Sequence, residues 1–211
     1  HMYPYDTKYI DRLVDWDDRG ANFQLTDFER VVALGSKTDT PNRIGGVSDE
    51  ALAEVLDKHH FDVCVVKSDG ARSRWIKAPE AHEPMIPSMT DIVVPVVSIK
   101  SIGRPLDDRT AHRPEKIAEI VRGRTGDLIT ARAVSKLLAS EQGALKDVLG
   151  YTVVPLLNMV DNARAQNLAR KVAERALAQT TRFDRVLLAS MKTGAIKEIV
   201  TRTGSSRNAL N

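Results

Sequence analysis

The amino-acid sequence predicts an α/β protein in which a layered, mostly parallel sheet is flanked by helices. Two observations carry this prediction. A short β-branched run at 31–34, a helical pattern and a second β-branched run at 61–66 follow one another, which is the order of a βαβ unit. Strand and helix patterns then alternate along the rest of the chain. The length of 211 residues suits one α/β domain, which we expect to span residues 3–201.

The run at 61–66 is the strand around which we expect the sheet to form. Its sequence, Phe-Asp-Val-Cys-Val-Val, is short and β-branched, which is typical of a strand buried on both faces. Cys64, the only cysteine, lies inside it, which indicates a core position and fits a reducing cytoplasm. Asp69 follows at the expected carboxyl end, where ligands bind in open α/β sheets. Asp69 is therefore a candidate for holding a metal ion or orienting a phosphate, although an Asp-Gly pair is also a common structural turn.

The remaining elements are predicted from apolar periodicity and capping residues. Residues 3–30 are weakly patterned: Ile10, Leu13 and Val14 could share a helical face, and 22–25 could be a short edge strand. Pro95 should place its strand near an edge or make it irregular, because proline donates no backbone hydrogen bond. We expect strands at 31–34, 92–98, 151–157 and 185–189, helices that begin at Ser48, Pro114 and Thr130, and helices at 162–178 and 193–201. We also expect residues 1–2 to be a cloning remnant or a start and 204–211 to be a frayed tail.

Composition and charge exclude several classes of function. The formal net charge is only +3 and aromatic residues make up 5%, so the chain lacks the basic face and the stacking residues of a nucleic-acid-binding protein. No apolar stretch approaches the roughly 20 residues of a membrane span, and no leader pattern is present. We therefore expect a cytoplasmic protein with neither nucleic acid nor membrane as a partner.

A long segment between 69 and 87 is dense in charge and proline. This composition excludes helix and strand and favours either a functional or a disordered loop. Three cations of this segment, Arg72, Arg74 and Lys77, fall within a stretch of six residues, so we expect them to bind an anion. A solvated surface loop is the alternative.

Two histidines raise the question of a transition-metal site. His82, Glu83 and His112 could supply ligands for one. Their spacing matches no recognised ligand pattern, and lone histidines serve many hydrogen-bonding roles. A structural or phosphate-contacting histidine is therefore the favoured interpretation.

Polar residues follow a later strand as well. Asn158 and Asp161 come at the expected end of the strand at 151–157. An Asn-x-x-Asp pattern in this place can read a nucleotide base, because the amide supplies a donor and an acceptor while the carboxylate accepts from ring and exocyclic N–H groups. Alternatively, Asp161 or Asn162 caps the helix that begins there. Neither interpretation excludes the other.

Three motifs of the chain stand out together. The first runs from Asp69 to Pro87, with Lys-Ala-Pro-Glu-Ala-His-Glu-Pro-Met-Ile-Pro at 77–87 as its most specific part; the second is Gly-Arg-Pro-Leu at 103–106 with His-Arg-Pro-Glu at 112–115; the third is Leu-Asn-Met-Val-Asp at 157–161. These motifs resemble those of the YqeC family of accessory proteins for selenium-dependent molybdenum hydroxylases. The resemblance extends from about Met2 to Thr201. The resemblance implies a P-loop nucleotide-hydrolase-like fold and a role in maturing a selenium-containing molybdenum cofactor site.

The chain departs from the family in two respects. Lys67 stands where the family usually has an acidic residue, so a second carboxylate for a metal is absent. The glycine-rich phosphate loop is absent too: no Gly-x-x-x-x-Gly-Lys-Ser/Thr pattern occurs, and Gly-Ser-Lys-Thr at 35–38 lacks the glycine before the lysine. We therefore expect an N-terminally truncated version of the fold without useful turnover of nucleoside triphosphates. We also expect either a self-associating sheet edge, and hence a homo-oligomer, or a rearranged segment at 3–30.

Two classes of function stay open. In the first, a nucleotide-dependent accessory enzyme uses Mg²⁺ and ATP or GTP, with Asp69 as catalytic and metal-binding residue, Glu83 as second metal ligand, and Asn158 and Asp161 as base readers. In the second, a non-catalytic binding or delivery module holds an anionic cofactor or an apo molybdenum hydroxylase. The anion site of both is expected to consist of Arg72, Arg74, Lys77, His82, Arg104, His112 and Arg113. We expect Asp69, the loop and the segment at 112–113 to meet in one cleft at the carboxyl edge of the sheet.

Overall fold

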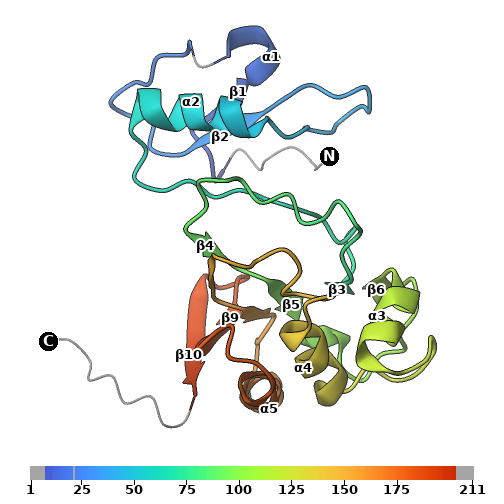
Figure 1. The fold of residues 1–211 in the computed structure, drawn as a ribbon. Coiled ribbons are helices and arrows are strands. Elements are labelled where there is room, and N and C mark those ends of the chain that lie inside the picture. The colour runs from blue at the N-terminus through green and yellow to red at the C-terminus, as the bar shows by residue number, and fades with distance from the viewer. Residues whose placement is uncertain (1–7, 21, 203–211) are drawn as a thin grey trace, which may run out of the picture. The chain divides into compact units, whose positions relative to one another are not determined.

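The structure is a computed structural model that describes residues 8–20 and 22–202 (Figure 1). The expected start at 1–2 and the expected tail at 204–211 lie outside the described residues. The fold is mixed α/β, with short, mostly parallel strands and helices, as the sequence predicts. Among the described helices none is both long and apolar enough to cross a membrane.

The contacts of the chain separate it into two units, and each is described by itself. The N-terminal unit comprises residues 1–67 and 87–89, and the C-terminal unit comprises residues 68–86 and 90–211. The sequence-based expectation is one domain over 3–201. All candidate site residues belong to the C-terminal unit.

The N-terminal unit contains two parallel strands and two helices. Its elements are β1 (Arg12–Asp15), α1 (Trp16–Arg19), β2 (Val32–Gly35) and α2 (Asp49–His59). β1 pairs in parallel with β2, which confirms the strand predicted at 31–34. Ser48 caps α2 as predicted, because its hydroxyl accepts a hydrogen bond from Ala51 N at 3.2 Å. Val14, Phe23 and Val55 form the buried core of this unit.

Two predictions for the start of this unit are wrong. Leu13 and Val14 do not share a helical face, because they lie in β1, where successive side chains point to opposite sides: Leu13 is exposed and Val14 is buried. The segment at 22–25 is not a strand. Phe23 is instead buried, and its ring stacks on that of His59 in α2 with 4.1 Å between centroids.

The run at 61–66 is not a buried strand either. It is extended but pairs with no strand in the described part of the chain, and Val65 is 90% exposed. Cys64 is exposed rather than part of the core. A β-branched run becomes a strand only when a neighbouring ladder is present, and no partner strand is present here among the described residues. Asp69 therefore follows an extended connection and not the end of a sheet strand.

The C-terminal unit is built on a four-stranded sheet of order β10-β9-β8-β5. Its strands are β5 (Val96–Ser98), β8 (Leu156–Asn158), β9 (Arg185–Ser190) and β10 (Ala195–Thr201). The first three are parallel to one another, whereas β10 is antiparallel to β9. The helix predicted at 193–201 is wrong, because the chain reverses after Ser190 through Gly194, whose φ is +62°, and its backbone groups then pair with β9.

Two prolines interrupt one longer parallel pairing. β4 (Ile92–Val93) pairs with β7 (Thr152–Val153), and β5 pairs with β8 in the same register. Pro95 and Pro155 lie between the two stretches, where Leu156 N still donates to Pro95 O at 2.9 Å. The strands predicted at 92–98 and 151–157 are therefore each split at a proline, which lacks the N–H that a ladder needs. β5 also lies at the edge of its sheet, as Pro95 predicts.

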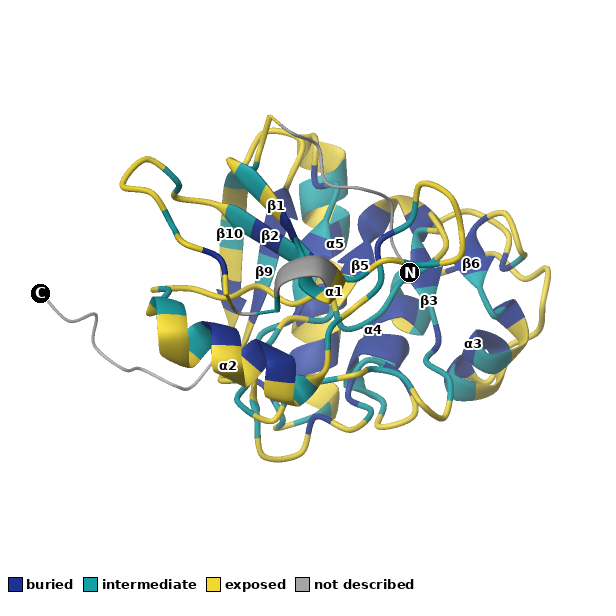
Figure 2. Ribbon diagram, turned by 90° about the horizontal axis from the view of Figure 1, so that it is seen from above, coloured by how far each residue is buried: buried dark blue, intermediate teal, exposed yellow. Residues whose placement is uncertain are grey.

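Three helices belong to this unit, of which the last packs against the sheet and the other two pack on a neighbouring helix. They are α3 (Pro114–Val121), α4 (Ala131–Ala139) and α5 (Ala163–Gln179). Each begins as predicted: Pro114 occupies the first turn of α3, and the side chains of Thr130 and Asn162 accept hydrogen bonds from backbone N–H groups of α4 and α5. α5 contacts β9, β10 and α4, and α4 contacts α3. Figure 2 shows dark blue, buried residues along α4 and α5.

Leu157 anchors β8 in the main core, because its side chain is fully buried directly before Asn158. We predict that Leu157→Ala lowers the free energy of unfolding by about 3 kcal/mol, since a large-to-small change in a packed core removes contacts and leaves a cavity. Leu149→Ala, at a side chain that is 84% exposed, should change it by less than about 0.5 kcal/mol. Urea unfolding at pH 7 measures both variants, and equal losses would contradict this core.

Candidate functional site

A short parallel ladder brings the charged loop to the segment around His112. It consists of β3 (Ile76–Lys77) and β6 (Ala111–His112). Lys77 lies opposite His112, and Ala78 N donates to His112 O at 3.3 Å. Arg113 follows β6 directly. The structure thus brings together the loop after Asp69 and the segment at 112–113, although their meeting point is this two-stranded ladder and not the edge of the four-stranded sheet.

Lys77 lies between two carboxylates. Its Nζ is 2.8 Å from Asp69 Oδ2 and 2.6 Å from Glu83 Oε2. The side chain of Lys77 is only 14% exposed, so water screens these ion pairs less than it screens pairs on the surface. From the sequence, Asp69 and Glu83 are predicted to bind a metal ion and Lys77 is predicted to bind an anion. In the structure both carboxylates bind the ammonium group of Lys77 instead.

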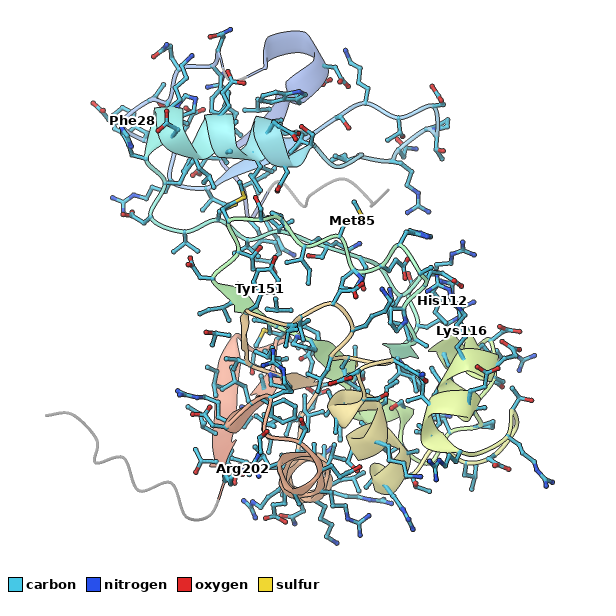
Figure 3. The ribbon with its side chains drawn as sticks, viewed as in Figure 1. Phe28, Met85, His112, Lys116, Tyr151 and Arg202 are labelled. Atoms are coloured by element: carbon cyan, nitrogen blue, oxygen red, sulfur yellow. The ribbon has the colours of Figure 1, made fainter. Side chains whose placement is uncertain are left out.

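Arg113 completes this cluster. Its Nη1 donates to Glu83 Oε2 and to Ala78 O, both at 2.8 Å, and its Nε lies 2.9 Å from Glu80 Oε1. Lys116 lies in the first turn of α3, where Figure 3 labels it, and it pairs with the other oxygen of Glu80. We call Asp69, Lys77, Glu80, Glu83, Arg113 and Lys116 the ion-pair cluster. Three acidic and three basic side chains make it neutral overall.

Glu83 shares more of these bonds than any other carboxylate of the ion-pair cluster. Burial alone would raise the pKa of Glu83, but hydrogen bonds from Arg113, Lys77 and the backbone N–H of Glu80 outweigh it and lower the pKa from 4.5 to about 2. Lys146 fixes the backbone at the same residue, because its Nζ donates to Glu83 O at 2.8 Å. Glu83 is therefore ionised at neutral pH, and it holds two cations instead of exchanging protons.

Asp69 and Glu83 do not fit a Mg²⁺ site in this arrangement. Mg²⁺ takes a near-octahedral set of oxygens at close range. The ammonium of Lys77 occupies the place between the two carboxylates, and both oxygens of Glu83 accept hydrogen bonds from Arg113. In the part of the chain that the structure describes, no three His, Cys, Asp or Glu side chains gather in a way that could hold a metal ion, so His82, Glu83 and His112 form no such group.

His112 lies among cations. Burial lowers the pKa of His112, and the positive charges of Arg113, Arg72 and Lys77 lower it further, against the opposing effect of Glu83. The imidazole is therefore neutral at pH 7. A neutral imidazole can donate one hydrogen bond and accept another.

Arg72 and Ser73 form a tight turn with an unusual backbone. Their φ angles are +47° and +60°, and Arg74 N closes the turn by donating to Ala71 O at 2.8 Å. Glycine or asparagine normally takes such positions, because other side chains strain the left-handed region. Arg74 donates to the carbonyls of Arg72 and Asp108. The exposed guanidinium of Arg72, in contrast, has no hydrogen-bond partner among the described residues.

Arg104 and His82, the other two residues of the predicted anion site, are exposed. The guanidinium of Arg104 stacks on Trp75, 5.4 Å from the ring centroid. Neither Arg104 nor His82 forms an ion pair within the described ranges. Both therefore lie outside the ion-pair cluster.

Asn158 ties two strand ends together. It is the last residue of β8, and its Oδ1 accepts hydrogen bonds from Met159 N at 2.7 Å and from Met191 N, just after β9, at 3.0 Å. The carbonyl that base recognition would use is thus occupied by the backbone. The amide nitrogen of Asn158 keeps its donors.

Asp161 makes a similar link nearby. Ser190 Oγ, at the end of β9, donates to Asp161 Oδ1 at 2.8 Å, and Lys100 Nζ lies 2.8 Å from Asp161 Oδ2. Lys100 belongs to the short helix η1 (Ile99–Ser101) that follows β5. Asn162, and not Asp161, caps α5. The two predicted base readers therefore join the carboxyl ends of β5, β8 and β9.

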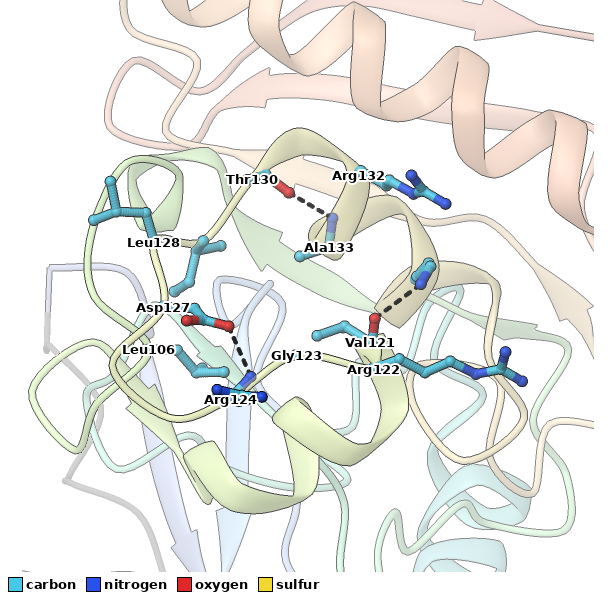
Figure 4. Close-up of a pocket in the computed structure, with 12 residues that line it drawn as sticks. Leu106, Val121, Arg122, Gly123, Arg124, Asp127, Leu128, Thr130, Arg132 and Ala133 are labelled. Atoms are coloured by element: carbon cyan, nitrogen blue, oxygen red, sulfur yellow. Dashed lines mark hydrogen bonds between the residues drawn. The ribbon is translucent and has the colours of Figure 1, made fainter.

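A separate surface hollow lies between the end of α3 and the start of α4 (Figure 4). Leu106 and residues between 121 and 136 line it. Asp127 accepts a hydrogen bond from Arg124 N at 2.8 Å inside it, and Figure 4 shows the side chains of Arg122 and Arg132 pointing away. None of the predicted site residues lines this hollow.

Sequence reasoning missed three residues that complete the ion-pair cluster or support it, namely Glu80, Lys116 and Lys146. Lys116 is 36 residues from Glu80, and Lys146 is 63 residues from Glu83. No local pattern marks partners at such separations. Only the high charge density of the loop points to buried or half-buried ion pairs.

The ion-pair cluster leads to a prediction about stability and pH. Glu83→Gln should lower the free energy of unfolding by about 2 kcal/mol at pH 7, because two little-exposed cations lose a shared carboxylate. The pKa of Glu83 is depressed in the folded state, so its stabilising effect is present above about pH 4.5 and is lost as the pH falls toward about 2. The difference between wild type and Glu83→Gln should therefore be constant from pH 7 to pH 5 and shrink below about pH 4.5.

Urea unfolding at several pH values measures this difference. Glu119→Gln is the matched control, because Glu119 is exposed on α3 and belongs to no ion pair of the described residues. It should change the free energy of unfolding by less than about 0.5 kcal/mol at each pH. A Glu83→Gln loss that stays the same down to pH 3 would contradict the shared-carboxylate account.

Two comparisons with known proteins point to one family. The family described as YqeC protein matches residues 1–115. The uncharacterised protein YqeC of Escherichia coli (strain K12) is 30% identical over 107 residues, which cover 50% of this chain and 41% of that protein. The match thus spans about two fifths of the length of this relative. No solved structure matches the chain. The family match covers more than half of this chain, and the chain therefore belongs to the YqeC family.

Proposed function

We propose that this chain is an accessory protein for the maturation of a selenium-dependent molybdenum hydroxylase, and that it binds an anionic ligand beside Arg72 and His112. The ligand is a nucleotide or an anionic cofactor. Membership of the YqeC family and the three sequence motifs support the accessory role. A relationship to P-loop nucleotide hydrolases is part of the same proposal, supported by the parallel strands whose carboxyl ends carry Asn158 and Asp161.

The positive charge around His112 is the observation that carries anion binding. Three cations, Arg113, Arg72 and Lys77, all disfavour protonation of His112. Lys77 and Arg113 are neutralised by Glu83 and its neighbours, whereas Arg72 is unpaired among the described residues. A guanidinium fork binds phosphate and carboxylate oxygens in a bidentate manner. Among these three cations, Arg72 is therefore the one that contributes most to the binding of an anion.

The strained turn at Arg72 and Ser73 supports this assignment. Left-handed backbone at two successive residues that are not glycine costs roughly 1–3 kcal/mol each, and such strain clusters at ligand sites. Arg74 holds the turn in place through its bonds to the carbonyls of Arg72 and Asp108. Arg74 is thus a positioning residue as well as a cation. Lys77 and Arg113 stabilise the ladder of β3 and β6 that follows the turn, because both pair with Glu83.

The state of the carboxylates favours the non-catalytic form of this proposal. A general base works best when its pKa lies near the operating pH. The pKa of Glu83 is about 2, and Asp69 is paired with Lys77. Glu83 is therefore not poised to take a proton from water or from a substrate at pH 7, and the ammonium of Lys77 occupies Asp69. We therefore favour holding or delivering the anionic ligand over phosphoryl transfer.

Isothermal titration with inorganic phosphate, ATP and GTP, each with and without Mg²⁺, tests the anion site. The variant Arg72→Ala/Arg74→Ala should weaken binding by at least about tenfold, because it removes charge-assisted hydrogen bonds. The control Arg124→Ala/Arg175→Ala removes the same charge at exposed positions away from residues 69–83 and 108–113 and should bind as the wild type does. Unchanged affinity of Arg72→Ala/Arg74→Ala would exclude the loop as the ligand site.

The accessory role has a separate readout with the same proteins. An apo molybdenum hydroxylase is incubated with a selenium source and each variant, and its hydroxylase activity is then measured. The wild type and Arg124→Ala/Arg175→Ala should raise the activity, and Arg72→Ala/Arg74→Ala should not. Anion binding without any activation would reject the accessory role and leave the anion site standing.

A further inference from the structure

The segment from Phe61 to Lys67 is an extended chain that pairs with no strand of residues 8–20 and 22–202. It leaves the end of α2 as an unbroken thin tube (Figure 1), and it belongs entirely to the N-terminal unit. Val63 and Val65 are 75% and 90% exposed, and Val66 is 43% exposed. Exposed valines in an extended run of this length are unusual in a finished sheet, where β-branched side chains pack on neighbours.

The backbone of this segment is unpaired as well. Within the described residues, no backbone hydrogen bond is formed by any residue from Asp62 to Lys67. The nearest one on the C-terminal side runs from Met85 N to Ser68 O at 3.3 Å. A row of free N–H and C=O groups along an extended apolar chain is a template for strand addition. Natural edges are usually protected by proline, a bulge or inward charges, and this run contains no proline or glycine.

The order of the residues makes the segment complementary to itself in the antiparallel direction. If Cys64 of one copy lies opposite Val65 of the other, then Val63 lies opposite Val66, and Asp62 lies opposite Lys67. The two-fold axis repeats each of these pairs. The pairing therefore has an ion pair at each end and apolar pairs between them, which are the cross-strand combinations that stabilise a sheet.

We propose that Asp62–Lys67 pairs with the same segment of a second copy of this chain, as an antiparallel two-stranded ladder with Asp62 opposite Lys67. A shift of the register by one residue would place Asp62 opposite Val66 and remove both ion pairs, so the charges select the register. The contact is isologous and closes after two copies, which gives a dimer and not a fibre. A ladder of two strands is marginal on its own, so dimerisation depends on protein concentration.

Sedimentation velocity of the full chain over a range of concentrations tests this pairing. The wild type should form a reversible dimer. Val65→Lys should weaken dimerisation by at least about tenfold, because it replaces an apolar pair in the centre of the ladder with a charge. Leu149→Lys is the matched control, since Leu149 is 84% exposed in the C-terminal unit and its replacement should leave the dimer unchanged.

Charge reversal tests the register. Asp62→Lys and Lys67→Asp should each weaken the dimer, because like charges then face each other at both ends of the ladder. The double variant Asp62→Lys/Lys67→Asp restores opposite charges and should restore dimerisation. Hydrogen exchange should show that the amides of 62–67 are protected in the wild-type dimer and not in monomeric Val65→Lys.

Three results would overturn the proposal. The first is a wild type that stays monomeric at every concentration. If the amides of 62–67 are protected in that monomer, the segment pairs with another part of the same chain. The second is a dimer that Val65→Lys leaves intact, which would place the interface elsewhere. The third is a double charge reversal that fails to restore the dimer, which would reject the antiparallel register.

Discussion

The carboxylate of Glu83, held between Lys77 and Arg113, is the interaction on which the candidate site depends. Lys77 comes from β3 and Arg113 follows β6, so one carboxylate joins both strands of the short ladder. This ladder is only two residues long on each side, which is too short to be stable alone. The ion pairs therefore fix the register in which Lys77 faces His112, and without Glu83 the cations would repel one another.

The same constraint explains how the site divides its charges. Cations that are little exposed need a counter-charge nearby, because an unpaired charge in a low-dielectric environment is costly. Lys77 and Arg113 have such counter-charges within the loop. Arg72, on an exposed and strained turn, has no such counter-charge among the described residues, and we propose that it binds the ligand. The ion-pair cluster is therefore neutral overall, whereas the exposed guanidinium groups of Arg72 and Arg74, which we call the cationic rim, keep their positive charge. His112 is close enough to both groups of charges to feel Arg72 as well as Lys77 and Glu83.

Sequence patterns predicted the parts of the fold that local chemistry decides. Ser48, Thr130 and Asn162 each cap the helix that follows, because a cap is formed within three residues. The predictions of a strand at 61–66 and of a helix at 193–201 are wrong, because strand formation depends on a partner outside the segment. The first segment has no partner strand among the described residues, whereas the second pairs with β9. The charged loop was found from composition, but its pairing was not: Arg113 selects Glu83 across 30 residues, and only the fold brings them together.

Titration of the His112 imidazole by NMR, with and without inorganic phosphate, tests the cationic rim most directly. The account predicts a pKa below the ordinary 6.5 in the free protein, because burial and the three neighbouring cations disfavour the imidazolium. It also predicts that phosphate raises this pKa in the wild type, since a bound anion favours the charged form, and that the effect is absent in Arg72→Ala/Arg74→Ala. A pKa of His112 that is not lowered in the free protein, or that phosphate leaves unchanged in the wild type, would contradict the account.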